Sequence, residues 1–282
     1  MHPVLFRLGS LTVHTYGTLL ACGILLGLWL AQKRARAAGL NPDEVWNLGV
    51  FMVLAALAGA KLWFLLAFWS YYRANPMEIF SMSTLQAGGV WYGGMLTALA
   101  VAVIYTRRKK MKLLPLTDVY AAPLALGHGI GRLGCFSAGC CYGRATAQPW
   151  GVIFHDEYAH QLVGTPLGIA LHPTQLYEAA AEFLIFLILL RLSARSHRSG
   201  QIFGAYLVLY GITRFTIEFF RGDPGRTLLL GDAGSIMQLV SIGLMGFGIW
   251  LWTRHGSSGT SPNIAAGTTG ATVSHVPAAP AK

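Results

Sequence analysis

Residues 45–70 read VWNLGVFMVLAALAGAKLWFLLAFWS, a run in which Lys61 is the single charged side chain. As a helix, a run of this length extends about 39 Å, which exceeds the hydrocarbon thickness of a bilayer, about 30 Å. Across the 282 residues, 54% are hydrophobic and 11% are charged, less than half of the charged share of about 25% in soluble domains. The sequence therefore predicts a membrane protein.

Six further apolar segments have the length of a spanning helix: 14–32, 89–106, 116–134, 176–192, 202–220 and 234–252. We therefore expect an all-α, polytopic protein with about seven transmembrane helices in residues 1–254. The first segment is too long for a signal-peptide core and its basic cluster follows the apolar run, so it should remain as an anchor. Residues 255–282 consist mainly of Gly, Ser, Thr, Ala and Pro, which predicts a disordered tail.

The distribution of basic residues predicts the orientation. Thirteen of the 21 lysines and arginines follow the first, third, fifth and last segments, and five lie on the opposite side. The positive-inside rule then places the N-terminus outside and the C-terminus with its tail in the cytoplasm. The outer stretches 135–175 and 221–233 should form a small cap. Because the basic residues lie in short loops between apolar runs, we expect no nucleic-acid partner.

Charged residues fall within or at the ends of the apolar segments, among them Lys61, Arg132, Arg214 and Glu218. Charge at this depth is costly and needs a partner. Arg214 and Glu218, four residues apart, can form an ion pair that only fixes helix packing, and Tyr210 lies on the same helix face. Arg132 and Lys61 have no acidic residue within one turn. Their partner is a distant carboxylate or an anionic ligand, and phosphate suits an arginine fork best.

Other polar residues allow more than one interpretation. His128, one turn before Arg132, is either a packed histidine or a catalytic one. Glu182 lies inside an apolar segment without an explanation, on the same face as Glu178. Three thiols fall within seven residues, and their spacing lacks the paired ligands of a structural zinc site. They are a metal site, a disulfide or inert small residues; the three are Cys135, Cys140 and Cys141.

Five motifs together resemble the bacterial prolipoprotein diacylglyceryl transferases. They are HTYG at 14–17, GGVWYGG at 88–94, GRLG through GR at 131–144, HPTQLYE at 172–178 and YGITRFTIEFFR at 210–221. The resemblance covers most of residues 1–254. It implies that the diacylglyceryl group of phosphatidylglycerol is transferred to the lipobox cysteine thiol of signal-peptide-bearing prolipoproteins, with release of glycerol phosphate. It also implies a multi-pass protein of the bacterial inner membrane, in contact with bilayer lipid, that uses no cofactor and no metal.

The resemblance also assigns residues. It implies that Arg132 and Arg214 clamp the phosphate, that Glu218 orients Arg214, and that Tyr16, Gly143 and Tyr210 belong to the site. We add Arg144 and Lys61 as residues expected to bind substrate.

The chain departs from the family at three positions, with Tyr92, Cys135 and Cys140 where His, Asn and Glu are usual. The missing histidine is a common candidate for the base that forms the thiolate, so either this role is not required here, or Tyr92 or His128 takes it over. The attacking sulfur belongs to the substrate, and we therefore expect the chain's own thiols to be dispensable. The alternative function is a polytopic transporter for a metal ion or protons, which uptake into proteoliposomes would reveal.

Overall fold

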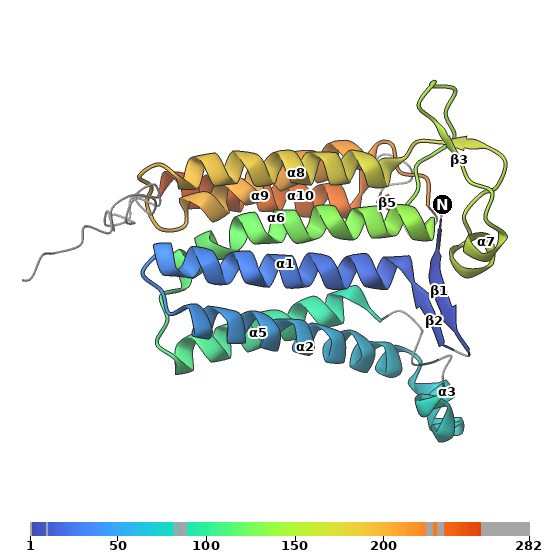
Figure 1. Ribbon diagram of the computed structural model, residues 1–282, viewed down its shortest axis with the longest axis horizontal. Coiled ribbons are helices and arrows are strands. Elements are labelled where there is room, and N and C mark those ends of the chain that lie inside the picture. Colours follow the sequence, from blue (N-terminus) through green and yellow to red (C-terminus); the bar gives the residue numbers. More distant parts are fainter. Residues whose placement is uncertain are drawn as a thin grey trace, which may run out of the picture.

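A computed structural model of the chain describes residues 2–9, 11–81, 84, 89–223, 228–229 and 234–254. In this part, seven helices of 18 or more residues lie side by side along the long axis of the molecule (Figure 1). They are α1 (Thr15–Ala37), α2 (Pro42–Ala67), α5 (Trp91–Arg108), α6 (Leu113–Ala138), α8 (Thr174–Ser193), α9 (Gln201–Glu218) and α10 (Ile236–Thr253).

Each long helix overlaps one of the seven predicted segments, so the prediction of a mostly helical protein is confirmed. Three of them, α1, α2 and α10, are long and apolar enough to cross a membrane by length and composition. How many of the seven cross, and in which orientation, stays a prediction. The predicted tail at 255–282 lies outside the described residues.

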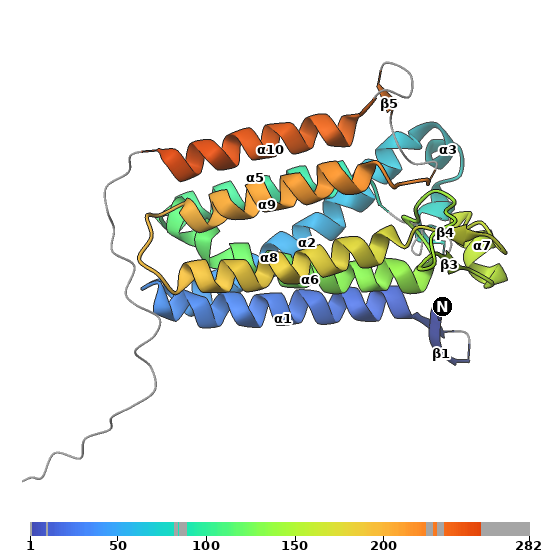
Figure 2. The same cartoon turned by 90° about the horizontal axis from the view of Figure 1, so that it is seen from above.

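The shorter elements gather at one end of the bundle, which we call the cap end (Figures 1 and 2). Three two-stranded antiparallel sheets lie here, so the fold is not purely helical. The sheets pair β1 (Val4–Leu8) with β2 (Leu11–His14), β3 (Val152–Ile153) with β4 (Ala170–Leu171), and β5 (Leu228–Leu229) with β6 (Gly234–Ser235). The short helices are α3 (Trp69–Ala74), the 3-10 helix η1 (Pro76–Phe80) and α7 (Glu157–Val163).

The predicted outer stretch 135–175 contributes to this end, although its first residues continue α6. The stretch 221–233 lies partly outside the described residues. The N-terminal hairpin and the α3–η1 segment were not predicted, because their sequences are short and lack the length signal that marks a spanning helix.

Glycines bring the long helices into backbone contact. A Cβ atom at Gly23 of α1 would lie 2.9 Å from the Gly127 carbonyl oxygen of α6, and one at Gly248 of α10 would lie 2.6 Å from the Gly204 oxygen of α9. Small residues at such contacts are the usual way in which helices pack tightly within lipid, where burial of apolar surface gives little driving force. The α1–α6 and α9–α10 pairs are therefore built as close-packed units.

Asp118 fixes α9 to α6 at the end opposite the cap. Its Oδ2 atom accepts a hydrogen bond from the Gly200 amide at 2.6 Å, and its Oδ1 atom accepts one from the Phe203 amide at 2.8 Å. Both amides belong to the start of α9, where amide groups have no intrahelical partner. The carboxylate of one helix thus caps the next and sets the register between them.

Candidate active site

Arg132 has a carboxylate partner from a different helix. Its Nη2 atom lies 2.9 Å from Oε1 of Glu178, which is 2% exposed on α8. The distant carboxylate that the sequence left open is therefore Glu178, brought opposite Arg132 because α8 packs along α6. A buried arginine is stable only when paired, and Glu178 holds the guanidinium in place while other N–H groups of the fork remain for further contacts.

His128 joins this pair to Glu182. The Nε of Arg132 donates to Nε2 of His128 at 3.1 Å, and Nδ1 of His128 lies 2.9 Å from Oε1 of the fully buried Glu182. With an acceptor at Nε2, the imidazole proton belongs on Nδ1, facing the carboxylate. Glu182, unexplained from the sequence, thus fixes the orientation of His128. The four side chains form one buried polar network between α6 and α8.

The second arginine reaches the same region from α9. Nη1 of Arg214 lies 2.8 Å from Oε2 of Glu218, and both side chains are nearly fully buried. Tyr210, one turn before Arg214, packs its ring 5.5 Å from that of His128 and lies within electrostatic range of both Arg132 and Arg214. The structure therefore places Tyr210, both arginines, His128 and Glu218 in one region, and their catalytic roles stay a prediction.

The network lies close to the cap end. Arg132 stands six residues before the end of α6, and Arg214 four residues before the end of α9. At 1.5 Å per residue these positions are about 9 Å and 6 Å inside the helix ends. Both arginines therefore lie within about two turns of the cap-end termini of their helices.

The cap is joined to α9 through Gly143 and Arg144. The Gly143 amide donates to the His172 carbonyl at 2.9 Å, and the Arg144 amide donates to the Phe220 carbonyl at 2.9 Å. A Cβ atom at Gly143 would lie 2.5 Å from the His172 oxygen, so this close approach requires glycine. The Arg144 side chain donates to the Phe219 carbonyl. These contacts give both residues a structural role, and their predicted contact with substrate stays a prediction.

The three remaining predicted residues lie in different surroundings. Tyr16 of α1 packs against Gly134 of α6 and lies within electrostatic range of Arg132 and of the three thiols, so it belongs to the same region. Lys61 donates to the Thr84 carbonyl at 2.5 Å, a contact that ties α2 to the chain that follows it. Tyr92 is 46% exposed on α5, which packs mainly against α2 rather than against α6 or α9.

The three thiols lie together just beyond the Arg132 network. Cys135 is in the last turn of α6, and Cys140 and Cys141 follow the helix. Their sulfur atoms all lie within 4.8 Å of one another, and each side chain is partly buried. Their spacing in the sequence left a metal site, a disulfide and inert residues open as alternatives, and the thiols come together because α6 ends at Ala138 and the turn after it folds the segment back.

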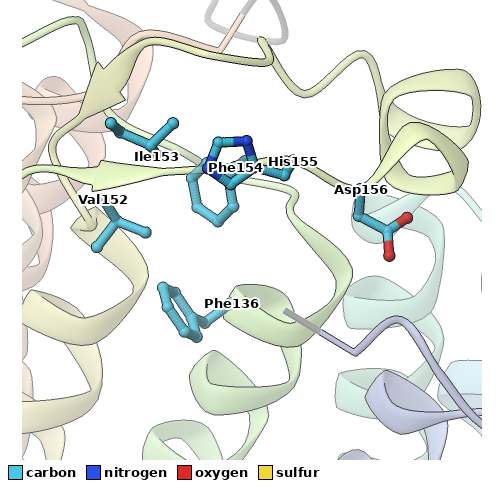
Figure 3. A pocket seen from close by; sticks show the side chains of 6 residues that line it. All are labelled: Phe136, Val152, Ile153, Phe154, His155 and Asp156. Atoms are coloured by element: carbon cyan, nitrogen blue, oxygen red, sulfur yellow. The ribbon is translucent and has the colours of Figure 1, made fainter.

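Two hollows lined mainly by apolar residues border Phe136. A cavity of about 250 Å³ lies between the end of α6 and the β3 segment, lined by Phe136, by the apolar residues 152–154, and by His155 and Asp156 (Figure 3). A second cavity of about 410 Å³ is lined by Phe136 and by residues of the N-terminal hairpin, among them Val4 and Leu5. Phe136 is one turn beyond Arg132 on α6, so these apolar surfaces lie next to the charged network.

Comparison with known proteins agrees with this arrangement. A sequence model described as prolipoprotein diacylglyceryl transferase matches residues 3–254. The chain is 35% identical over 243 residues to the phosphatidylglycerol–prolipoprotein diacylglyceryl transferase of Clostridium tetani, covering 86% of this chain and 94% of that protein. It is 33% identical over 251 residues to the enzyme of the same name from Geobacter sulfurreducens, covering 88% of this chain and 92% of the relative.

Proposed function

Because this chain belongs to the prolipoprotein diacylglyceryl transferase family, we infer that it transfers the diacylglyceryl group of phosphatidylglycerol to the lipobox cysteine of prolipoproteins. The observation that carries this inference is the placement of two arginines from different helices about Tyr210: Arg214 lies one turn after it on α9, and the Tyr210 ring packs 5.5 Å from that of His128, the partner of Arg132. A transferase needs positive charge here, because a phosphate group leaves during the reaction. The family match favours this function over the transporter considered from sequence.

The reaction joins the acceptor sulfur to the diacylglyceryl carbon that carries the phosphate. The bond between that carbon and the phosphate oxygen breaks, and its electron pair leaves with glycerol phosphate. Negative charge grows on the leaving phosphate in the transition state, where hydrogen-bond donors fixed in advance are most effective. We assign this role to Arg132, positioned by Glu178, and to Arg214, positioned by Glu218.

The remaining assignments concern binding and proton removal. Tyr16 and Tyr210 are proposed to donate hydrogen bonds to the lipid headgroup, and Arg144 and Lys61 to contribute to substrate binding. Gly143 allows the close approach of the cap backbone to the site.

Of the two candidates for the missing base, His128 lies nearer to Arg132 than Tyr92 does, but both of its ring nitrogens are engaged, Nε2 with Arg132 and Nδ1 with Glu182, so we propose that His128 positions Arg132. His128 contacts Arg132 directly, whereas α5 packs on the other side of the bundle against α2.

For the topology, we propose that all seven long helices cross the bacterial inner membrane, with the N-terminus outside. The basic residues support this orientation, because the end of the bundle opposite the cap carries Lys33, Arg34 and Arg36 and the groups at 107–112 and 191–198. Residues 1–254 then form the membrane domain, and 255–282 a cytoplasmic tail. The cap end faces the periplasm, where secreted preproteins present their lipobox.

A direct assay tests the function. Purified protein is mixed with phosphatidylglycerol and a lipobox peptide, and the peptide is expected to gain the mass of one diacylglyceryl unit. A peptide with serine in place of the acceptor cysteine is the matched control. Absence of transfer from any phospholipid to the cysteine peptide would refute the proposal.

A further inference from the structure

The thiol cluster has the geometry of a metal site. The sulfur atoms of Cys135, Cys140 and Cys141 lie within 4.8 Å of one another. Three sulfurs bound tetrahedrally to one zinc ion, at about 2.3 Å each, would be separated by about 3.8 Å. Each pair of sulfur atoms therefore has to approach by about 1 Å or less to share an ion, a change that side-chain rotation can supply.

The backbone around the thiols is held in place for this arrangement. Gly139 ends α6 in the left-handed conformation, and Cys141 adopts a φ of 59°, which is uncommon for a residue with a side chain. The Thr174 hydroxyl donates to the Cys141 carbonyl and the Gln175 amide to the Cys140 carbonyl, each at 2.7 Å. Uncommon backbone held by neighbouring residues is typical of functional sites.

The number of ligands distinguishes two kinds of site. Structural zinc sites usually have four protein ligands, whereas catalytic sites have three and leave one position for water or substrate. In the described part of the chain, the group consists of three thiols, without a fourth histidine, cysteine or carboxylate at the same distance. Three ligands from one short segment leave the fourth position open to an incoming group.

We propose that Cys135, Cys140 and Cys141 bind one Zn²⁺ ion, and that the sulfur of the acceptor cysteine becomes its fourth ligand. This inference rests on the proposed transferase function and says how the enzyme activates the acceptor thiol. It replaces the expectations from the family resemblance that the three thiols are dispensable and that no metal is used. It also accounts for the tyrosine at position 92, since a metal-bound sulfur needs no histidine base there.

The chemistry balances without a change of oxidation state. The acceptor thiol loses its proton to water as it coordinates zinc, because a coordinating thiol is deprotonated. The bound sulfur supplies an electron pair to the diacylglyceryl carbon, and a carbon–sulfur bond forms. The carbon–oxygen bond to phosphate breaks, and its electrons leave on the phosphate held by the arginines. Zinc remains divalent, and the thioether product, which carries no charge, is a weak ligand that dissociates.

The position of the cluster fits this sequence of events. Cys135 lies one turn beyond Arg132 on the same face of α6, so the nucleophile and the leaving phosphate can occupy neighbouring positions.

The first test measures metal in the full-length protein purified in detergent. We expect about one zinc per chain, lost in Cys135→Ser, Cys140→Ser and Cys141→Ser together with transfer. Cys22→Ser is the matched control, because Cys22 is exposed on α1, and it should retain both metal and transfer. Removing zinc from the wild-type protein with a chelator should abolish transfer, and Zn²⁺ alone should restore it, which excludes misfolding of the variants as the cause.

The second test detects the fourth ligand. In protein loaded with Co²⁺, the thiolate-to-cobalt absorption band should intensify when the lipobox peptide is added, and a serine peptide should leave it unchanged. Three results would each overturn the proposal. They are normal transfer by zinc-free protein, a disulfide among the three thiols in active protein, and a cobalt spectrum that does not change when the cysteine peptide is added. If zinc is bound but no phospholipid gives transfer, the proposed function fails instead.

Discussion

Replacing Arg214 by lysine tests whether a two-pronged contact with phosphate is needed. Nη1 of Arg214 contacts Glu218 at 2.8 Å, and the guanidinium has further N–H donors in a planar fork. A lysine ammonium keeps the charge, but it cannot hold Glu218 and two phosphate oxygens in one plane. Loss of one hydrogen bond to a charged group costs about 1.5–3 kcal/mol. The value of kcat/KM should therefore fall roughly 10- to 150-fold.

The assay is the initial rate of diacylglyceryl transfer to a lipobox peptide, at several phosphatidylglycerol concentrations. Arg73→Lys is the matched control, since Arg73 is an exposed arginine on α3 at the same end of the molecule. Its transfer rate should stay near that of the wild type. Near-normal kcat/KM in Arg214→Lys would refute the two-pronged contact and leave Arg214 as a simple source of charge.

Three further predictions concern the network, the cap and the bundle. His128→Gln should lower the transfer rate more than Tyr92→Phe, because His128 joins Arg132 to a buried carboxylate; equal rates in steady-state assays would contradict this. Gly143→Ala should lower stability by about 1–3 kcal/mol in thermal unfolding, because its Cβ would overlap two carbonyl oxygens, whereas Gly243→Ala, with open space around it, should not. Asp118→Ala should cost about 1–3 kcal/mol in the same measurement, since two amides lose their acceptor, and an unchanged midpoint would show that water replaces it.

The helical segments could be predicted because each carries its own signal. A run such as 45–70 contains enough apolar residues to identify a helix without reference to the rest of the chain. The face shared by Tyr210, Arg214 and Glu218 was also visible, because residues four apart on a helix are neighbours. Local periodicity therefore predicted the part of the candidate site that lies on α9.

The part of the candidate site on α6 and α8 depends on how the helices pack against each other, which the periodicity of one segment does not encode. Arg132 and Glu178 lie on different helices separated by the whole cap segment, and their contact exists because α8 packs along α6. An unpaired charge in an apolar run and a second unexplained carboxylate at Glu182 were the only signals of this partnership. The nature of the thiol cluster stayed open for a related reason, because the proximity of the three sulfur atoms depends on the turn after α6.

The hydrogen bonds from Gly200 and Phe203 to Asp118 determine how Arg132 and Arg214 align with each other. Arg132 follows Asp118 by 14 residues along α6, and Arg214 follows Gly200 by 14 residues along α9. Both helices run from the contact between Asp118 and Gly200 towards the site (Figure 1). Each arginine therefore lies about 21 Å along its helix from this contact. One residue inserted into either helix would shift its arginine by about 1.5 Å along the helix axis and rotate it by about 100°, so the alignment of the two arginines is determined at the end of the bundle opposite the site.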